Sequence, residues 1–216
     1  NQNEIVEIEN IFEDILEEKF VNQSTAKINY NEIYKYRSVN QVYKKLHNFL
    51  NDKINYNFYL RNVWFIKTQN QHIREELPFI AHIDKKRYLK VFLYINDIKK
   101  KNGAFTVSSN SNPKQNEVLR LNWWKENIHD PEKDKHGLLC SKKDLKFVPI
   151  EMEKGSIVCF DTNTPHFAGK VEIGEVRKVL RFNFFFDAHV SKLSFLKQKS
   201  IAVISKNINY LKDLIS

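Results

Sequence analysis

The N-terminal part of the chain carries hydrophobic residues at a helical period. Between residues 4 and 20 they recur at intervals of three or four, which predicts an amphipathic helix over this range; they are Ile5, Ile8, Phe12, Ile15, Leu16 and Phe20. A second helix is predicted after Ser38, a suitable N-cap residue. Its apolar face is expected to hold Val42, Leu46, Phe49 and Leu50. The stretch 188–216 shows similar spacing and predicts one or two C-terminal helices.

The middle of the chain shows a different pattern, in which short aromatic and β-branched runs alternate with turn-like stretches. The runs that predict strands are 57–68, 88–95, 104–108, 146–151, 156–160 and 176–186. Several short strands without intervening helices are typical of an antiparallel sandwich or barrel, here flanked by helices.

A single domain of 216 residues is expected from the length and the 42% hydrophobic content, which suffices for a sizeable core. It divides into a helical part (1–55), a β core (57–187) and the C-terminal helices (188–216). The polar segment 109–145 reads as an insertion that forms a lid. Its Trp123-Trp124 pair suits either packing against the barrel or stacking on a substrate.

Composition bears on the cellular setting. No apolar run approaches the roughly 18 residues of a membrane span, so a soluble protein is expected. Cys140 and Cys159 are far apart and form no CxxC pair, which is typical of reduced thiols in the cytoplasm.

The net charge of +9 is unevenly distributed. Residues 4–19 hold seven acids and one lysine, so the rest of the chain carries +15. Such a balance suits an anionic partner, for example a phosphorylated metabolite, an acyl-CoA, an acyl-carrier protein or nucleic acid. A lysine-rich, solvated surface is the simpler interpretation.

Candidate chemistry begins at His82 and Asp84. Residues i and i+2 of a strand point to the same side, so an imidazole and a carboxylate converge there. Alone, this pattern also fits a surface aspartate beside a core histidine. A third ligand, His166, follows another apolar strand and a turn. Two histidines and one carboxylate on one face of a metal ion are the arrangement of non-haem Fe(II) oxygenases.

Arg177 lies eleven residues after His166 in an aromatic strand. A buried guanidinium is costly unless it is paired, so either an anion meets it or the side chain reaches water from an edge strand. The far carboxylate of a co-substrate such as 2-oxoglutarate suits the two-pronged geometry of arginine.

Four pieces in this order resemble the phytanoyl-CoA dioxygenase-like branch of the Fe(II)/2-oxoglutarate dioxygenases. They are the HxD at 82–84, "NGAFTVSSNSN" at 102–112, "KGSIVCFDTNTPH" at 154–166 and "RKVLRFNFFF" from 177. The resemblance covers about residues 77–186. It implies a double-stranded β-helix (a jelly roll, or cupin-like core), Fe(II) on His82, Asp84 and His166, and 2-oxoglutarate on Arg177.

The chain also departs from this family. The usual Pro-Gly-Ser-His is replaced by residues 109–112, which puts the substrate class in doubt. Ala168 stands where a small hydroxyl residue is common, so Tyr94 or Thr106 is expected to assist in holding the co-substrate. The implied reaction consumes O2, releases succinate and CO2, and by default hydroxylates an unactivated C–H bond of a small or carrier-bound substrate. Desaturation and ring closure are the alternative outcomes.

Three rival functions remain at this point. A catalytically silent cupin-like binding protein would keep the barrel without the chemistry. A nucleic-acid demethylase of the same superfamily would use the basic body, but the aromatic residues are placed as strand cores rather than along a basic stripe. A zinc hydrolase is disfavoured because no water-activating environment is evident.

Overall fold

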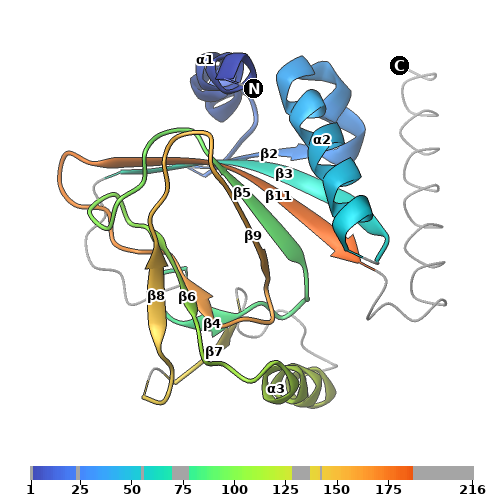
Figure 1. Cartoon of the computed structure of the whole chain (residues 1–216), viewed down its shortest axis with the longest axis vertical. Helices are drawn as coiled ribbons and strands as arrows, with labels where there is room; N and C mark the ends of the chain where they lie inside the picture. The colour runs from blue at the N-terminus through green and yellow to red at the C-terminus, as the bar shows by residue number, and fades with distance from the viewer. Residues whose placement is uncertain are drawn as a thin grey trace.

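The fold is mainly β and consists of two antiparallel sheets with helices outside them (Figure 1). The computed structural model describes residues 2–22, 25–54, 56–69, 78–127, 137–141 and 143–186. The C-terminal helices expected over 188–216 lie outside these residues. Two facing sheets with flanking helices confirm the predicted double-stranded β-helix.

The larger sheet has six strands in the order β1-β2-β3-β11-β5-β9. Their bounds are β1 (Phe20–Asn22), β2 (Thr25–Asn29), β3 (Phe58–Gln69), β11 (Val176–Phe186), β5 (Leu89–Tyr94) and β9 (Ile157–Asp161). β3 and β11 pair along their whole length, with an irregularity between Asn183 and Phe184. These two strands form the platform on which the rest of the sheet is built.

The smaller sheet has five short strands in the order β7-β4-β10-β6-β8. They are β7 (Leu138–Leu139), β4 (His82–Ile83), β10 (His166–Phe167), β6 (Phe105–Ser108) and β8 (Phe147–Ile150). Two of the three predicted metal ligands therefore lie within strands of this sheet.

Two helices, α1 (Gln2–Glu18) and α2 (Arg37–Lys53), cover the outer face of the larger sheet, and the 3-10 helix η1 (Tyr30–Lys35) precedes α2 (Figure 1). Alternate residues of β11 point to this face, so Leu180, Phe182 and Phe184 are fully buried in the core. Phe12 of α1 meets Phe65 of β3 with ring centroids 5.1 Å apart. This side of the sheet provides the main hydrophobic core.

The structure corrects three details of the predicted helices. Phe20 belongs to β1, because α1 ends at Glu18. α2 begins at Arg37 with Tyr36 as its N-cap, so Ser38 lies inside the first turn. Phe49 is 58% exposed, whereas Val42, Leu46 and Leu50 are buried. The apolar face of α2 is therefore narrower than its hydrophobic pattern suggests.

The acidic α1 pairs with lysines of the basic body. Glu13 contacts Lys67 and Lys178, each at 2.8 Å. Glu4 binds Lys45 at 2.6 Å. These ion pairs therefore neutralise part of the acidic charge of α1 with lysines of the same chain.

The segment 109–145 contains a helix that the sequence pattern did not predict, α3 (Pro113–Glu126). Asn112 caps its N-terminus, because its side chain accepts hydrogen bonds from the backbone N–H groups of Lys114 and Gln115. Figure 1 shows α3 at the opposite end of the molecule from α1 and α2. In the described part of the chain, no helix is long and apolar enough to cross a membrane.

Candidate metal centre

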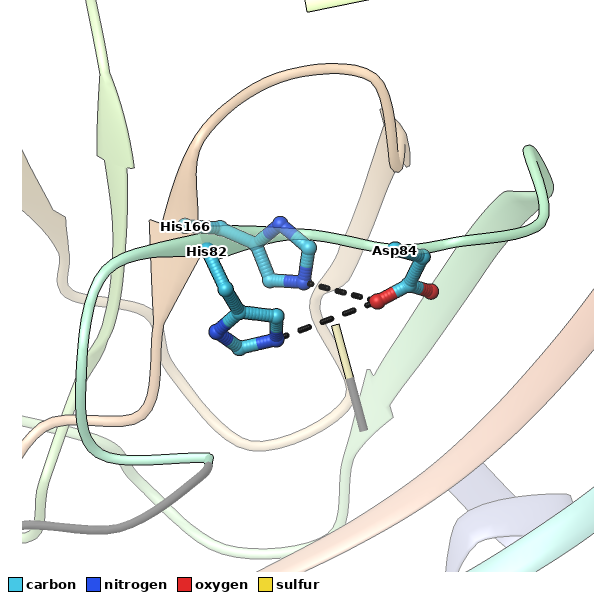
Figure 2. Close-up of side chains that lie close together, drawn as sticks. All are labelled: His82, Asp84 and His166. Atoms are coloured by element: carbon cyan, nitrogen blue, oxygen red, sulfur yellow. Dashed lines mark ion pairs between the residues drawn. The ribbon is translucent and has the colours of Figure 1, made fainter. Parts of the chain in front are cut away.

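His82, Asp84 and His166 converge at one point of the smaller sheet (Figure 2). His82 and His166 are directly opposite each other on β4 and β10, and Asp84 follows β4 by one residue. Asp84 Oδ1 lies 3.8 Å from His82 Nε2 and 3.7 Å from His166 Nε2. All three residues are buried. The pairing of two short strands thus brings together two histidines that are 84 residues apart in the sequence.

Hydrogen bonds to the backbone orient both imidazoles. The Nδ1 atom of His82 lies 2.8 Å from the Ile80 carbonyl oxygen, and that of His166 lies 2.8 Å from the Thr164 carbonyl oxygen. A carbonyl can only accept, so each Nδ1 carries the proton. Both Nε2 atoms are therefore unprotonated and directed toward Asp84, as metal ligation requires.

The charge states at the site also suit a cation. Burial acts to raise the pKa of Asp84, but Lys90 and the two histidines outweigh it and hold that pKa below its usual range. Burial and the nearby Lys90 lower the pKa of His166 to about 3. At neutral pH the site therefore presents a carboxylate and a neutral imidazole at this position.

The spacing of the three ligands fits one metal ion. Ligand atoms about 2.1 Å from an ion lie roughly 3 Å apart at right angles and about 4.2 Å apart on opposite sides. The three ligand atoms lie within 4.8 Å of one another. A small inward movement would complete coordination, and three ligands leave further positions open.

The sequence analysis missed two basic residues that support Asp84. Lys90 of β5 contacts Asp84 Oδ2 at 2.6 Å, on the oxygen that does not face the histidines. Arg120 of α3 donates from Nε to the Asp84 backbone carbonyl at 3.0 Å. Strand alternation puts Lys90 on the same face of β5 as Phe92. No feature of the local sequence predicts that Lys90 or Arg120 contacts Asp84.

Aromatic rings surround His166. Its ring centroid lies 5.6 Å from that of Phe105 and 5.1 Å from that of Phe160. Phe92 contacts both of these phenylalanines, at 5.0 and 5.2 Å. The site therefore has an apolar wall, supplied by β5, β6 and β9 rather than by Phe182 and Phe184 of β11.

Arg177 is buried on the inner face of β11, the face opposite the helical core. Its guanidinium donates to the Gly103 carbonyl and, at 3.3 Å, to Thr68 Oγ1. The Gly103 carbonyl belongs to a turn in which Gly103 has a φ of 77°, a conformation that favours glycine. No carboxylate among the described residues pairs with Arg177.

The two residues expected to assist Arg177 are placed differently. Tyr94 is fully buried and is close enough to Arg177 to influence it. Burial raises the pKa of Tyr94 to about 12, so the phenol stays protonated. Thr106 is paired with Phe167, so its side chain points to the face of the smaller sheet opposite to that of His166. Its hydroxyl donates to the Ala104 carbonyl oxygen at 3.2 Å. The structure thus brings Tyr94, but not Thr106, to Arg177.

Trp123 and Trp124, which the sequence singled out, lie in α3. His72, His129, His136 and His189 are outside the described residues. Trp123 is buried with Ile83 and Leu138, while Trp124 Nε1 donates to the Lys85 carbonyl at 2.9 Å. Both tryptophans thus pack α3 against the strand and loop that carry His82 and Asp84.

Comparison with protein families gives one match over most of the chain. The model of the phytanoyl-CoA dioxygenase family matches residues 7–179. No curated protein matches the sequence.

Several solved structures share the fold at low sequence identity. The non-haem α-ketoglutarate-dependent epimerase SnoN from nogalamycin biosynthesis has a TM-score of 0.56 and 13% identity, over 86% of this chain and 74% of that one. HygX from Streptomyces hygroscopicus, with nickel and 2-oxoglutarate bound, gives 0.58 and 11%, over 85% and 78%. EctD from S. alaskensis, with bound Fe, gives 0.56 and 11%, over 85% and 69%.

The family match spans both histidines, the aspartate and the arginine, and the fold agrees with it. The chain belongs to the phytanoyl-CoA dioxygenase family, and with it to the non-haem Fe(II)/2-oxoglutarate-dependent oxygenases.

Proposed function

We propose that the chain hydroxylates an unactivated C–H bond of a small organic molecule, with Fe(II) held by His82, Asp84 and His166. The observation that carries this proposal is the convergence of two unprotonated Nε2 atoms and one carboxylate oxygen on a single point. When bound there, iron supplies the redox chemistry by which O2 and 2-oxoglutarate become succinate, CO2 and an oxidised substrate.

Arg177 is the proposed anchor for the far carboxylate of 2-oxoglutarate. Its guanidinium is buried and has only neutral acceptors among the described residues. A charge-assisted pair with a carboxylate would offset the cost of that burial. The planar guanidinium can donate to both oxygens of such a group. Tyr94 would add a hydroxyl donor, because its proton stays on at neutral pH and no acceptor among the described residues takes it.

The protein's further contribution is a dry and rigid surrounding. The phenylalanine rings beside His166 keep water from that side of the site. The backbone carbonyls behind both histidines fix the direction of the ligand atoms before any ion arrives. Such preorganisation lowers the cost of assembling the site, and water exclusion protects reactive species.

Succinate formation tests the proposal. The chain is purified without oxygen and supplied with Fe(II), 2-oxoglutarate and O2, alone and with a panel of small acids, amino acids and carrier-bound acyl groups. We expect slow succinate formation without substrate and faster formation with the fitting compound. No succinate under any condition, with iron bound, would indicate a catalytically silent binding protein instead.

A further inference from the structure

A polar strip lies beside the metal centre on the inner face of the larger sheet. Arg181 and Asn183 lie four and six residues after Arg177 along β11, so the three share this face. Directly opposite them on β3 are Trp64 and Asn62. Lys90, which binds Asp84, is opposite Asn183 on the other side. The strip therefore continues from the proposed 2-oxoglutarate anchor past the metal ligands.

Among the residues that the structure describes, Arg181 has no anion of its own. Its guanidinium carbon lies 5.1 Å from the centre of the Trp64 ring, and its Nε has no hydrogen-bond partner. The one described carboxylate that acts on it is Asp84, whose outer oxygen Lys90 already holds at 2.6 Å. Burial lowers the pKa of Arg181 to about 10, so the group stays charged at neutral pH.

Asn183, two residues after Arg181 on the same face of β11, carries a second buried atom without a partner among the described residues. Asn62 Oδ1 accepts from Trp64 Nε1 at 3.1 Å and from Asn183 Nδ2 at 2.7 Å. Because the indole nitrogen can only donate, the orientation of both amides is fixed. Asn183 Oδ1 is thereby turned away from Asn62, and this buried atom has no partner. Unsatisfied buried groups are uncommon, so a polar ligand is expected here. Arg181 Nε is a donor and needs an acceptor, whereas Asn183 Oδ1 is an acceptor and needs a donor.

The net charge of this region predicts whether that ligand is an anion or a cation. Lys90 and Asp84 cancel each other, which leaves the two cations Arg177 and Arg181 on the inner face. Fe(II) would add two positive charges, and 2-oxoglutarate would bring two negative ones. Two positive charges then remain in a partly desolvated region, where unpaired charge is costly.

We propose that Arg181 binds an oxyanion, a carboxylate or a phosphate, on the primary substrate, and so determines that the substrate is an acid. This inference rests on the proposed function, because it assigns 2-oxoglutarate to Arg177 and leaves Arg181 for the second molecule. Stacking on Trp64 holds the guanidinium plane in place, and Nε with a terminal nitrogen can then bind two oxygens of one anion.

Binding measurements on the holoprotein test this inference. Calorimetry under anaerobic conditions, with Fe(II) and saturating 2-oxoglutarate, measures the affinity for butyrate, butyl phosphate and neutral butyramide. The wild-type chain should bind at least one of the two anions clearly more tightly than butyramide. Arg181→Gln should weaken that anion by about 30-fold or more, the usual loss for a desolvated charge pair. The preferred anion distinguishes a carboxylate from a phosphate substrate.

Lys178→Gln is the matched control. Lys178 lies three residues before Arg181 on the opposite face of β11, where it contacts Glu13. This variant loses the same charge from the same strand and should bind the probes like wild type. Arg181→Lys keeps the charge without the fork, and should recover only part of the affinity. Arg181→Lys also tests the inference if Arg181→Gln does not fold.

Two results would overturn the inference. In the first, wild type binds neither anion better than butyramide. In the second, the preferred anion keeps its affinity when Arg181 is replaced. Because no turnover is needed, these results are independent of succinate formation. Succinate without anion preference would reject the role of Arg181 alone, and anion preference without succinate would reject the oxygenase function.

Discussion

At the scale of single residues, Lys90 is the least expected part of the site. It binds the outer oxygen of Asp84 and leaves the inner oxygen facing both histidines. This contact would hold Asp84 to one-oxygen ligation and keep further metal positions open. Residues that orient metal ligands in this way are commonly worth 10- to 100-fold in metal affinity or activity.

Replacing Lys90 therefore gives a direct prediction. Lys90→Met should reduce iron-dependent succinate formation by about 10- to 100-fold, because Asp84 loses the contact that fixes its orientation. Lys90→Arg should restore part of the activity, since it returns a cation to the outer oxygen. Turnover and metal affinity are measured together. Near-normal values in Lys90→Met would show that Asp84 needs no such support.

Substitutions of the two arginines of β11 should change the required 2-oxoglutarate concentration to different extents. Arg177→Ala should raise the concentration needed for half-maximal turnover by about 30-fold to several thousand-fold, because a buried carboxylate–guanidinium pair is lost. Arg177→Lys should recover part of this loss, and Arg181→Ala should have a much smaller effect. Titration of 2-oxoglutarate in each variant measures the difference. The reverse ranking would mean that the co-substrate lies four residues further along β11.

Individual residues were predictable where chemistry limits the choice. A buried-strand HxD, a histidine after a turn and an arginine eleven residues on each predict a role from residue type and spacing. Lys90, Arg120 and Trp64 gave no such signal, because their partners are set by strand register and by the docking of α3. Phe49 was predicted to be buried but is exposed. The hydrophobic pattern of a helix does not show how far the element packed against it extends.

At the scale of elements, α3 connects the insertion with the metal centre. Arg120 holds the Asp84 carbonyl, and Trp124 holds the Lys85 carbonyl one residue on. Arg120→Gln should therefore destabilise the fold by about 1.5–3 kcal/mol, the range for a buried hydrogen bond from a charged group. Urea unfolding measures this loss. The exposed Lys125 of the same helix supplies the control Lys125→Gln, and equal stability of the two variants would count against the anchoring role of Arg120.

The segment 109–145 remains predicted to act as a lid. Limited proteolysis without iron and 2-oxoglutarate should cut within it first, and addition of both should protect it. We expect the cuts to avoid the anchored turns of α3 around Arg120 and Trp124. First cleavage in another segment, or cleavage that is insensitive to iron and 2-oxoglutarate, would contradict the lid.

Long elements were predictable and short ones were not. β3 and β11 were predicted almost at their observed bounds, because many consecutive β-branched and aromatic residues give an unambiguous pattern. β4, β7 and β10 have two residues each, too few to show a period. α3 lacks an apolar stripe, since Val118, Leu119 and Leu121 are exposed while Arg120 is buried. Its start was nevertheless readable in Asn112-Pro113, a cap followed by a first-turn proline.

At the scale of the whole molecule, the two faces of the larger sheet have different roles. The outer face carries the hydrophobic core with α1 and α2, which stabilises the platform. The inner face carries Arg177, Arg181 and Lys90 beside the metal ligands of the smaller sheet. Alternation along β11 allows one strand to serve both roles, with phenylalanines on one side and arginines on the other.

The central claim is that His82, Asp84 and His166 form one Fe(II) site that drives 2-oxoglutarate turnover. The most direct test measures iron bound per chain and succinate formed, in wild type, His82→Ala and His166→Ala, with circular dichroism to verify folding. The account predicts about one iron per wild-type chain, weakened iron binding in both folded variants, and no succinate from either. A folded variant that binds iron and forms succinate at near wild-type rates would contradict it.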